Sequence, residues 1–400
     1  MDSTAATVTR ATTPLVVTPA SLRAAFATVP DPRRGASVDY PLAAVLAMTV
    51  AALLCAQTSV LAIAEWGGRQ SADLLSALGF RGTRTPCQST PHRLFRKLDP
   101  QALAAALTAA FTTVAAPRSQ GRGSQGVAID GKAHRGRLRY EEGGAPIHAL
   151  SAFCHDRGVV LATEPVGHGQ DKEEAELTVA PALIEHIDWH GRVLTGDALF
   201  CQRDLCQRVL DAGGDYLLVA KANQPTLYDA LKLLFDPGWE APLVDRREAR
   251  TVDKGHGRSR EVRHLVASTD LDGYIAWPGM AQAFRIERTW REHGEEKRQV
   301  RYGITSLPPS IGPPRRLLAL KRRHWRIENQ SHRSKDVNLG EDASAVHAGT
   351  GPTVVAMLRD AAISVLRASG CSTIASRLRR HSQYPDEAVA LVTSPLRTRA

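Results

Sequence analysis

The sequence predicts a mixed α/β protein with a helical N-terminal part, a sheet-containing core and a β-rich insertion. Three observations support this prediction. Apolar side chains follow helical spacing from Ser21 to Phe111. After a linker rich in Pro, Arg, Gly and Ser at residues 116–126, short apolar runs alternate with helical stretches. Between residues 236 and 314, polar and apolar side chains alternate as in strands.

The N-terminal region divides into two predicted segments. Residues 1–20 show no periodicity and are expected to be disordered. Residues 21–116 are expected to form a helical domain, which begins where Ser21 can cap the first helix. The uncharged stretch from Tyr40 to Ala64 is long enough to span a bilayer. Its polar residues near 57–59 favour two buried helices instead, so no membrane partner is expected.

The central region alternates between strand and helix patterns. We expect strands at residues 127–130, 147–153, 159–165, 192–195 and 216–220, and helices at residues 173–187, 205–212 and 226–235. In the insertion at 236–314, strands are expected at 260–268, 283–289 and 297–305. Residues 380–400 are expected to be a flexible tail because Pro385 and Pro395 interrupt them.

Three acidic residues stand in settings that suit catalysis. Asp130 and Asp197 each end an apolar run that predicts a strand, and Glu328 lies in a predicted basic helix. Two acids at strand ends and one on a late helix can converge on a hard divalent cation, which prefers oxygen ligands. Taken alone, the acids have ordinary alternatives: an Asp before Gly, such as Asp130, is commonly a turn residue, and a Glu on a basic helix, such as Glu328, is commonly a surface ion-pair partner.

Composition narrows the class of partner. Lys and Arg number 51 against 41 Asp and Glu, a net charge of +10 that favours nucleic acid as the partner. The six cysteines form no CxxC pair, so neither a disulfide framework nor a zinc site is expected. The N-terminus lacks the pattern of a signal peptide. These features favour a cytoplasmic protein that binds nucleic acid.

Motifs around the three acids resemble the DDE transposases of bacterial insertion sequences, in particular the H-repeat-associated type. The resemblance extends from about Leu22 to about Leu366. The matching segments are Ala128–Lys132, Gly196–Ala198, Cys201–Gln202, Gly214–Gln224, His256–Arg258, His324–Trp325, Ile327–Asn329, Asp336–Val337 and Glu341–Asp342.

The resemblance implies a fold and a reaction. The implied fold is a ribonuclease H-like mixed-sheet core in residues 126–235 and 315–370, in which the first and fourth strands are neighbours. Asp130, Asp197 and Glu328 are then the catalytic triad and hold two Mg²⁺ ions, with Mn²⁺ as a substitute. The implied activity is strand cleavage at the element's ends and strand transfer into target DNA by a homodimer on the DNA.

A second set of residues is expected to contact double-stranded DNA, both the terminal inverted repeats and the target. Cations near the acids suit phosphate contacts, with plain surface solvation as the alternative. Trp325 suits stacking on an unpaired base, with core packing as the alternative. The set comprises Lys132, Arg135, Lys221, Asn223, Gln224, His256, Arg258, Arg322, Arg323, Trp325 and Lys335. The acids Asp336, Glu341 and Asp342 are expected to end a helix and pair with the arginine run, with metal binding by Glu341 or Asp342 as the alternative.

The sequence also departs from the family's pattern. Related transposases often have Tyr, Arg and Lys at the positions of Lys321, His324 and Lys335, so only the last one matches. These substitutions keep two alternatives open. One is a catalytically silent DNA-binding protein derived from a transposase, and the other is a nuclease without strand transfer.

Overall fold

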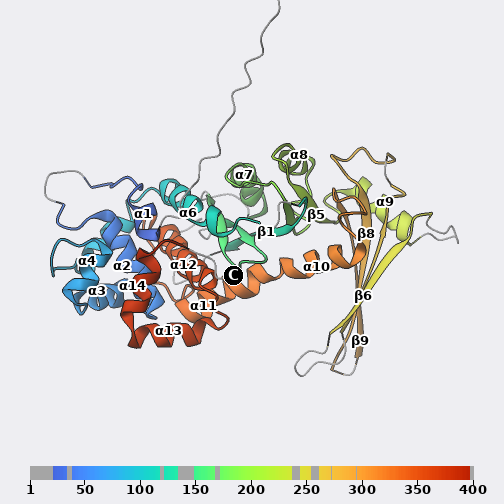
Figure 1. The fold of residues 1–400 in the computed structure, drawn as a ribbon. Helices are drawn as coiled ribbons and strands as arrows, with labels where there is room; N and C mark the ends of the chain where they lie inside the picture. Colours follow the sequence, from blue (N-terminus) through green and yellow to red (C-terminus); the bar gives the residue numbers. More distant parts are fainter. Residues whose placement is uncertain are drawn as a thin grey trace, which may run out of the picture.

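The computed structural model describes residues 21–33, 38–117, 121–133, 148–166, 172–236, 244–253, 261–271, 273–293 and 295–396. These residues form a helical part, a central sheet flanked by helices, and a blade of long strands, arranged side by side (Figure 1). The N-terminal helices are α1 Leu22–Phe26, α2 Leu42–Leu54, α3 Val60–Gly68, α4 Ala72–Leu78, α5 Ser89–Phe95 and α6 Pro100–Val114.

Helix α2 lies at the centre of the helical part. Twelve of its thirteen residues are buried because it packs against α1, α12 and α14. Its apolar sequence therefore reflects burial on all sides. The helix ends at Leu54 and α3 begins at Val60, so the expected break near residues 57–59 is confirmed. No helix among the described residues has the length and apolar character that a membrane crossing requires.

The C-terminal helices complete the same core. They are α12 Gly351–Ala368, α13 Ile374–Gln383 and α14 Pro385–Thr393. Ala388, Val389 and Val392 of α14 are buried, and α14 packs against α2 and α4. The prediction of a flexible tail from residue 380 is wrong for this segment. Pro385 stands at the first position of α14, where proline starts a helix rather than interrupting one.

A single mixed sheet of nine strands joins the core to the insertion. Its order is β3-β2-β1-β4-β5-β9-β8-β7-β6. The core strands are β1 Gln125–Ala133, β2 His148–Cys154, β3 Val160–Val166, β4 Arg192–Gly196 and β5 Asp215–Ala220. Helices α7 Lys172–Glu185 and α8 Arg203–Asp211 connect β3 to β4 and β4 to β5, and α9 Pro225–Phe235 leads from β5 to the insertion. The predicted alternation of strands and helices is confirmed.

The insertion has one strand more than predicted. It contains β6 Arg247–Asp253, β7 Glu261–Ser268, β8 Gln282–Glu292 and β9 Glu295–Thr305. Strand β9 pairs with β5 and with β8, so the insertion continues the core sheet. On one face of β9, Tyr302 and Ile304 are buried, and Val300 packs beside them. The chain then returns to the core through α10 Pro314–His324, η1 Ile327–His332 and α11 Arg333–Leu339.

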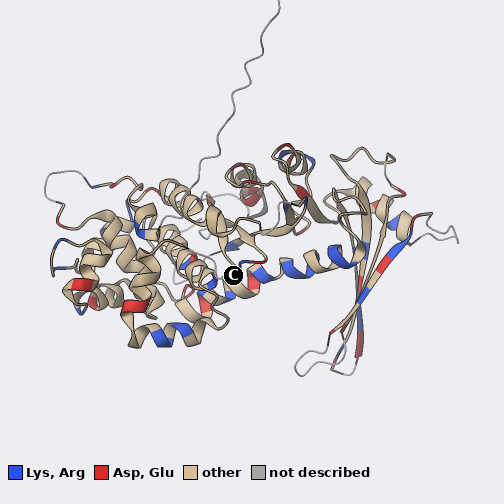
Figure 2. Ribbon diagram, viewed as in Figure 1, with Lys and Arg blue, Asp and Glu red and all other residues tan. Residues whose placement is uncertain are grey.

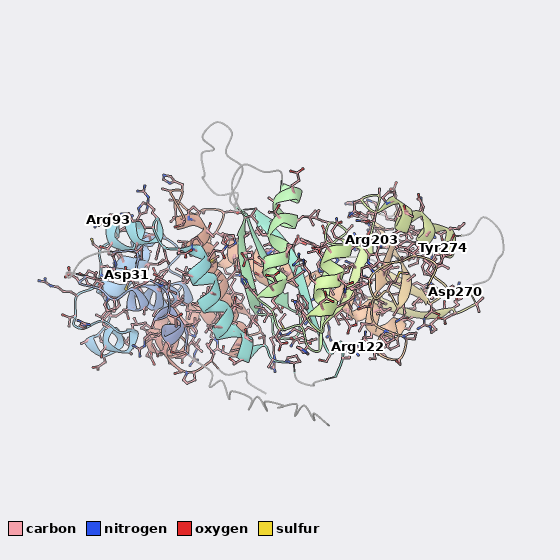
Figure 3. The ribbon with its side chains drawn as sticks, turned by 90° about the horizontal axis from the view of Figure 1, so that it is seen from above. Asp31, Arg93, Arg122, Arg203, Asp270 and Tyr274 are labelled. Atoms are coloured by element: carbon pink, nitrogen blue, oxygen red, sulfur yellow. The ribbon has the colours of Figure 1, made fainter. Side chains whose placement is uncertain are left out.

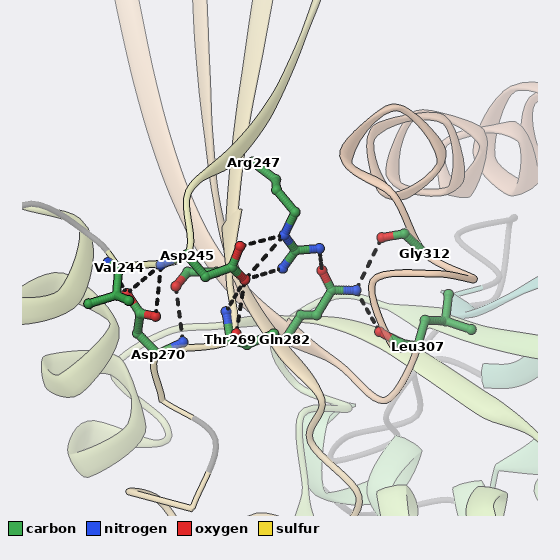
Figure 4. A network of polar contacts seen from close by, with 9 residues as sticks. Val244, Asp245, Arg247, Thr269, Asp270, Gln282, Leu307 and Gly312 are labelled. Carbon is green, nitrogen blue, oxygen red and sulfur yellow. Dashed lines mark hydrogen bonds and ion pairs between the residues drawn. The ribbon is translucent and has the colours of Figure 1, made fainter.

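Polar contacts fix the base of the insertion (Figure 4). Arg247 of β6 contacts Asp245 and also donates to Gln282 Oε1 at 2.8 Å. Gln282 in turn donates to the carbonyl oxygens of Leu307 and Gly312, just before α10. Because these contacts span three segments far apart in the sequence, they define how the insertion is oriented relative to α10.

Two arginines tie further segments to the sheet (Figure 3). Arg122, before β1, pairs with the buried Asp215 at the start of β5, with 2.9 Å between Nη2 and Oδ1. Arg203 of α8 lies 4.7 Å above the ring of Trp277, in the segment between β7 and β8. The first contact holds the segment before β1 to β5, and the second holds α8 to the segment between β7 and β8.

Candidate active site

The two strand acids emerge at the same level of the sheet. Strands β1 and β4 are parallel neighbours, and Ala128 pairs with Thr195. Asp130 and Asp197 each lie two residues beyond this pair. Asp197 directly follows β4, whereas β1 continues three residues past Asp130, to Ala133. The two acids therefore stand at one level on neighbouring strands, but only Asp197 lies at a strand end. Asp130 keeps 36% of its side chain exposed, and Asp197 is exposed.

Glu328 lies on a short π-helix rather than on a regular α-helix. The π-helix η1 separates α10 from α11, and its end is marked by the bond from the Arg333 amide to the Glu328 carbonyl oxygen. Such wider turns occur frequently at functional sites. Ile327 is buried against Ala128, Phe153 and Val160, and Glu328, the next residue, is exposed. This packing fixes the backbone that carries Glu328.

Asp130, Asp197 and Glu328 all line one cleft of about 620 Å³. Among the described residues, no group of three or more His, Cys, Asp or Glu side chains is arranged to hold a metal ion. The three carboxylates nevertheless offer oxygen atoms that are open to solvent on rigid elements. That donor set fits hard divalent cations, which complete their coordination with water and substrate oxygens.

The loop after β4 is held in place by Asn223 and Gln224, two residues that were predicted to contact DNA. The Leu199 amide donates to Asp197 Oδ1 at 2.9 Å. Asn223 Nδ2 donates to the Ala198 carbonyl oxygen at 2.7 Å, and Gln224 Nε2 donates to Gln202 Oε1 at 2.9 Å. In this structure, therefore, the amides of Asn223 and Gln224 support the Asp197 loop.

Lys132 anchors β1 to the segment after η1. Its ammonium lies 2.5 Å from both Asp336 Oδ1 and Glu341 Oε2, and it donates to the His332 carbonyl oxygen at 3.3 Å. Only 11% of its side chain is exposed. The expected phosphate contact by Lys132 does not fit this position, because its donors are already used. The acids Asp336 and Glu341 pair with lysine rather than with the arginine run.

Lys335 lies in the interior. Its ammonium is 3.0 Å from Asp360 Oδ1 of α12, and 3% of its side chain is exposed. Burial opposes the charge of Lys335, but Asp360 and Glu341 outweigh that effect and raise its pKa. The predicted DNA contact by Lys335 does not fit this interior position. The lysine balances a buried carboxylate instead.

Helix α10 is rich in basic residues, coloured blue in Figure 2, and its last turn contains Lys321, Arg322 and Arg323. Arg322 pairs with Asp253 and Arg323 pairs with Asp156, each at 2.8 Å. Arg322 lines a second cleft of about 470 Å³, between α10 and the insertion strands. Arg323 lines neither of the two clefts. Of the two predicted arginines, only Arg322 thus faces a cleft.

The first and second clefts meet at four residues, Arg301, Lys321, Trp325 and Glu328. Trp325 is 48% exposed, so packing in the core is excluded for it. Arg301 of β9 lies 5.9 Å above the Trp325 ring. Lys321 is 7% exposed, and burial, with repulsion from Arg301, lowers its pKa to about 8. Lys221, at the end of β5, is exposed and lines the first cleft.

Sequence reasoning did not select Arg301 as a site residue, and it considered Lys321 only as part of the basic run that leads to Glu328. Arg301 lies in a strand with several other arginines nearby, and nothing in its local pattern distinguishes it. Lys321 precedes Glu328 by seven residues, a spacing of about two helical turns that places both on one side of a regular helix. This spacing could have identified Lys321 as a site residue from the sequence.

Two buried histidines lie close together at the cleft, and one of them, His324, lines it. Thr195 Oγ1 is 3.1 Å from His155 Nε2 and 3.3 Å from His324 Nδ1. Burial, with the nearby charge of Arg323, lowers the pKa of His155 to about 3. Burial and Lys321 likewise lower the pKa of His324 well below its usual value. Both rings are therefore neutral, which explains how His324 can be accommodated in the interior.

Three predicted DNA contacts, Arg135, His256 and Arg258, lie outside the described residues. So does the predicted disordered segment at residues 1–20.

Comparison with known proteins identifies the family. The model of the Transposase DDE domain matches residues 112–362, and the model of the DDE_Tnp_1-associated region matches residues 23–110. The chain therefore belongs to the DDE transposase family. The resemblance to the H-repeat-associated type is confirmed by similarity to named relatives. Transposase DDE domains generally use divalent metal ions.

Two relatives and one solved structure illustrate the similarity. "Putative transposase YncI" of Escherichia coli O157:H7 is 27% identical over 362 residues, which cover 88% of each chain. "H repeat-associated putative transposase YhhI" of Escherichia coli K12 is 26% identical and covers 84% of this chain and 88% of the relative. A cryo-EM structure of the piggyBac transposase synaptic complex with hairpin DNA aligns with a TM-score of 0.38 at 12% identity, covering 93% of this chain and 77% of the other.

Proposed function

We propose that this protein cuts DNA at the ends of an insertion sequence and joins the freed 3′-hydroxyl to target DNA. The observation that carries the proposal is the placement of the three acids. Asp130 and Asp197 share one level on two neighbouring parallel strands, and Glu328 lines the same cleft. We further propose that β1 to β5 form a ribonuclease H-like core, which the order β3-β2-β1-β4-β5 supports.

In this proposal, Asp130, Asp197 and Glu328 hold two Mg²⁺ ions, for which Mn²⁺ can substitute. Bound at this site, the ions would activate the attacking hydroxyl and stabilise the leaving oxygen. The protein's own contribution is positioning. The Leu199 amide and the Asn223 side chain hold the Asp197 loop, and the Lys132 contacts hold β1 against the segment after Glu328.

The proposed substrate is double-stranded DNA, at both the element's terminal inverted repeats and the target. The basic side chains of the two clefts support this choice, because backbone phosphates attract Lys and Arg regardless of sequence. Lys221, Arg322 and Trp325 remain proposed contacts. We also propose that a homodimer holds the two element ends, and that the protein acts at the nucleoid in the bacterial cytoplasm.

The test is cleavage of a supercoiled plasmid that carries the gene with its native flanks. Purified protein is incubated with Mg²⁺ or Mn²⁺, and the DNA ends are mapped. We expect breaks at defined positions in the flanks and, with time, joined products. Neither should form with Asp197→Ala or with EDTA. Breaks that persist in Asp197→Ala would refute the assigned site.

A second candidate is a silent DNA-binding protein derived from a transposase. It is favoured by the substitutions at Lys321 and His324, where related enzymes often carry Tyr and Arg. This candidate predicts binding to the flanks without any cut, whereas a nuclease without strand transfer predicts cuts without joined products. The plasmid assay separates all three activities.

A further inference from the structure

Lys321 is a buried cation without an anionic partner in the described part of the chain. Its ammonium donates one hydrogen bond, to the Gly196 carbonyl oxygen at 3.4 Å, and it forms no ion pair with a carboxylate of the described residues. The other two buried lysines of the site differ, because Lys132 meets Glu341 at 2.5 Å and Lys335 meets Asp360 at 3.0 Å. Burying an unpaired charge costs free energy. We therefore expect an anion from outside the protein to bind at Lys321.

Two more cations surround Lys321 and increase the cost. Arg301 and Lys221 both repel its ammonium, while Asp197 attracts it. Among the described residues, neither Arg301 nor Lys221 forms an ion pair, and Arg301 only stacks above Trp325. Three like charges at one place destabilise the protein unless an anion joins them. Asp197 cannot fill this role alone, because it is also the proposed metal ligand.

We propose that Lys221, Arg301 and Lys321 form a seat for one backbone phosphate of the bound DNA strand, with Lys321 as its central contact. The proposal rests on the proposed DNA substrate and names the residues that position it. Lys321 and Arg301 line both clefts, and Glu328 does too. A strand that runs from the cleft beside the insertion to the acids therefore passes over the seat. The seat holds the backbone next to the reacting phosphate without reading bases.

The first test compares DNA binding and stability in Lys321→Met. The probe is a duplex from the gene's native flank, measured without divalent metal so that no cleavage is needed. We expect roughly tenfold weaker binding, as for the loss of one charge-assisted hydrogen bond. The slope of log K against log salt should fall in magnitude by about 1. The unfolding temperature should stay equal or rise, because an unpaired buried charge has been removed.

Arg323→Met is the matched control. Arg323 lies on the same helix, is exposed and paired with Asp156, and lines neither cleft. The same charge is lost, but binding should weaken much less than in Lys321→Met. Equal losses in the two variants would show a general charge effect and overturn the seat. A lower unfolding temperature in Lys321→Met, with unchanged binding, would show a structural lysine and overturn it too.

The second test neutralises the DNA instead of the protein. Duplexes that each carry a single uncharged methylphosphonate are scanned along the flank. One position should weaken binding by the wild-type protein and leave Lys321→Met unaffected. Equal losses at every position in both proteins would overturn the seat. Because these readouts are binding, a seat found in a protein that never cuts DNA would refute only the proposed transposase activity.

Discussion

The ammonium of Lys132 lies 2.5 Å from Glu341 Oε2, and this contact joins two parts of the active site that are far apart in the sequence. Lys132 stands two residues after Asp130 on β1, and Glu341 follows α11, the helix after the Glu328 segment. Only 2% of the Glu341 side chain is exposed. The distance between Asp130 and Glu328 therefore depends on a buried ion pair.

Replacing Lys132 should cost both stability and cleavage. In Lys132→Met, the carboxylates of Glu341 and Asp336 lose their shared cation, and a broken buried pair costs about 3–5 kcal/mol. Urea unfolding measures this loss, and plasmid cleavage measures the effect on the site. Adding Glu341→Gln should restore part of the stability. If Lys132→Met unfolds like the wild type, the anchoring role is refuted.

The pair of Lys335 and Asp360 should behave as a structural unit. Lys335→Leu leaves a buried carboxylate unpaired and should destabilise the protein by about 3–5 kcal/mol. The double variant Lys335→Leu/Asp360→Asn should recover most of that loss, because no unpaired charge remains. Its affinity for DNA should match the wild type. Weaker DNA binding by the folded double variant would contradict the interior position of Lys335.

Acid should weaken the fold through His155. Its pKa is about 3 in the folded chain and 6.5 in the unfolded chain, so only the unfolded chain takes up a proton between these values. The contribution of neutral His155 to the free energy of unfolding is therefore fully present above pH 6.5, and it is lost as the pH drops toward 3. This one residue contributes about 1.4 kcal/mol per pH unit within the window. Urea unfolding across that range should show a smaller pH slope in His155→Gln, and an unchanged slope would exclude His155 as a source.

Asn223 should affect cleavage more than binding. Asn223→Ala removes the hydrogen bond to the Ala198 carbonyl oxygen and loosens the loop that carries Asp197. Since small displacements of a reacting group cost up to about 100-fold in rate, we expect a roughly tenfold to 100-fold slower cleavage. Affinity for the flank duplex, measured without metal, should change little. A loss of affinity with normal cleavage would instead identify Asn223 as a DNA contact.

Divalent metal should stabilise the protein through the acids. Mn²⁺ raises the unfolding temperature if it binds the folded chain more tightly than the unfolded chain. Asp197→Asn should abolish this rise, because it removes the charge. The amide oxygen can still accept the Leu199 hydrogen bond, so the unfolding temperature without metal should stay close to the wild type. A full metal-induced rise in the variant would place the metal elsewhere.

The strand acids could be predicted from local pattern, and the other parts of the site could not. Asp130 and Asp197 end apolar runs, and strands of that kind recur wherever a sheet is covered on both faces. The π-helix at Glu328 depends on the packing of Ile327 against β1, β2 and β3, which no local pattern reveals. Lys335 resembles a surface cation until Asp360, 25 residues later in the chain, is placed beside it.

Two errors in the predicted fold have the same origin. Strand β6, Arg247–Asp253, alternates in exposure but is polar on both faces, so its period was not visible as apolar alternation. Helix α14 begins at Pro385, and a proline can either interrupt a helix or begin one. The burial of α14 against α2 favours the helix. In each case, tertiary neighbours determine what the local sequence leaves undecided.

The pairing of β9 with β5 has a consequence for the evolution and engineering of this protein. Because β9 occupies the side of β5 that would otherwise be open, removing the insertion would leave a core strand with unpaired backbone groups. Such an edge invites pairing between separate molecules. The insertion is therefore not a module that can be cut out or exchanged at its ends, and a minimal version of this protein must either retain β9 or supply another strand to protect β5.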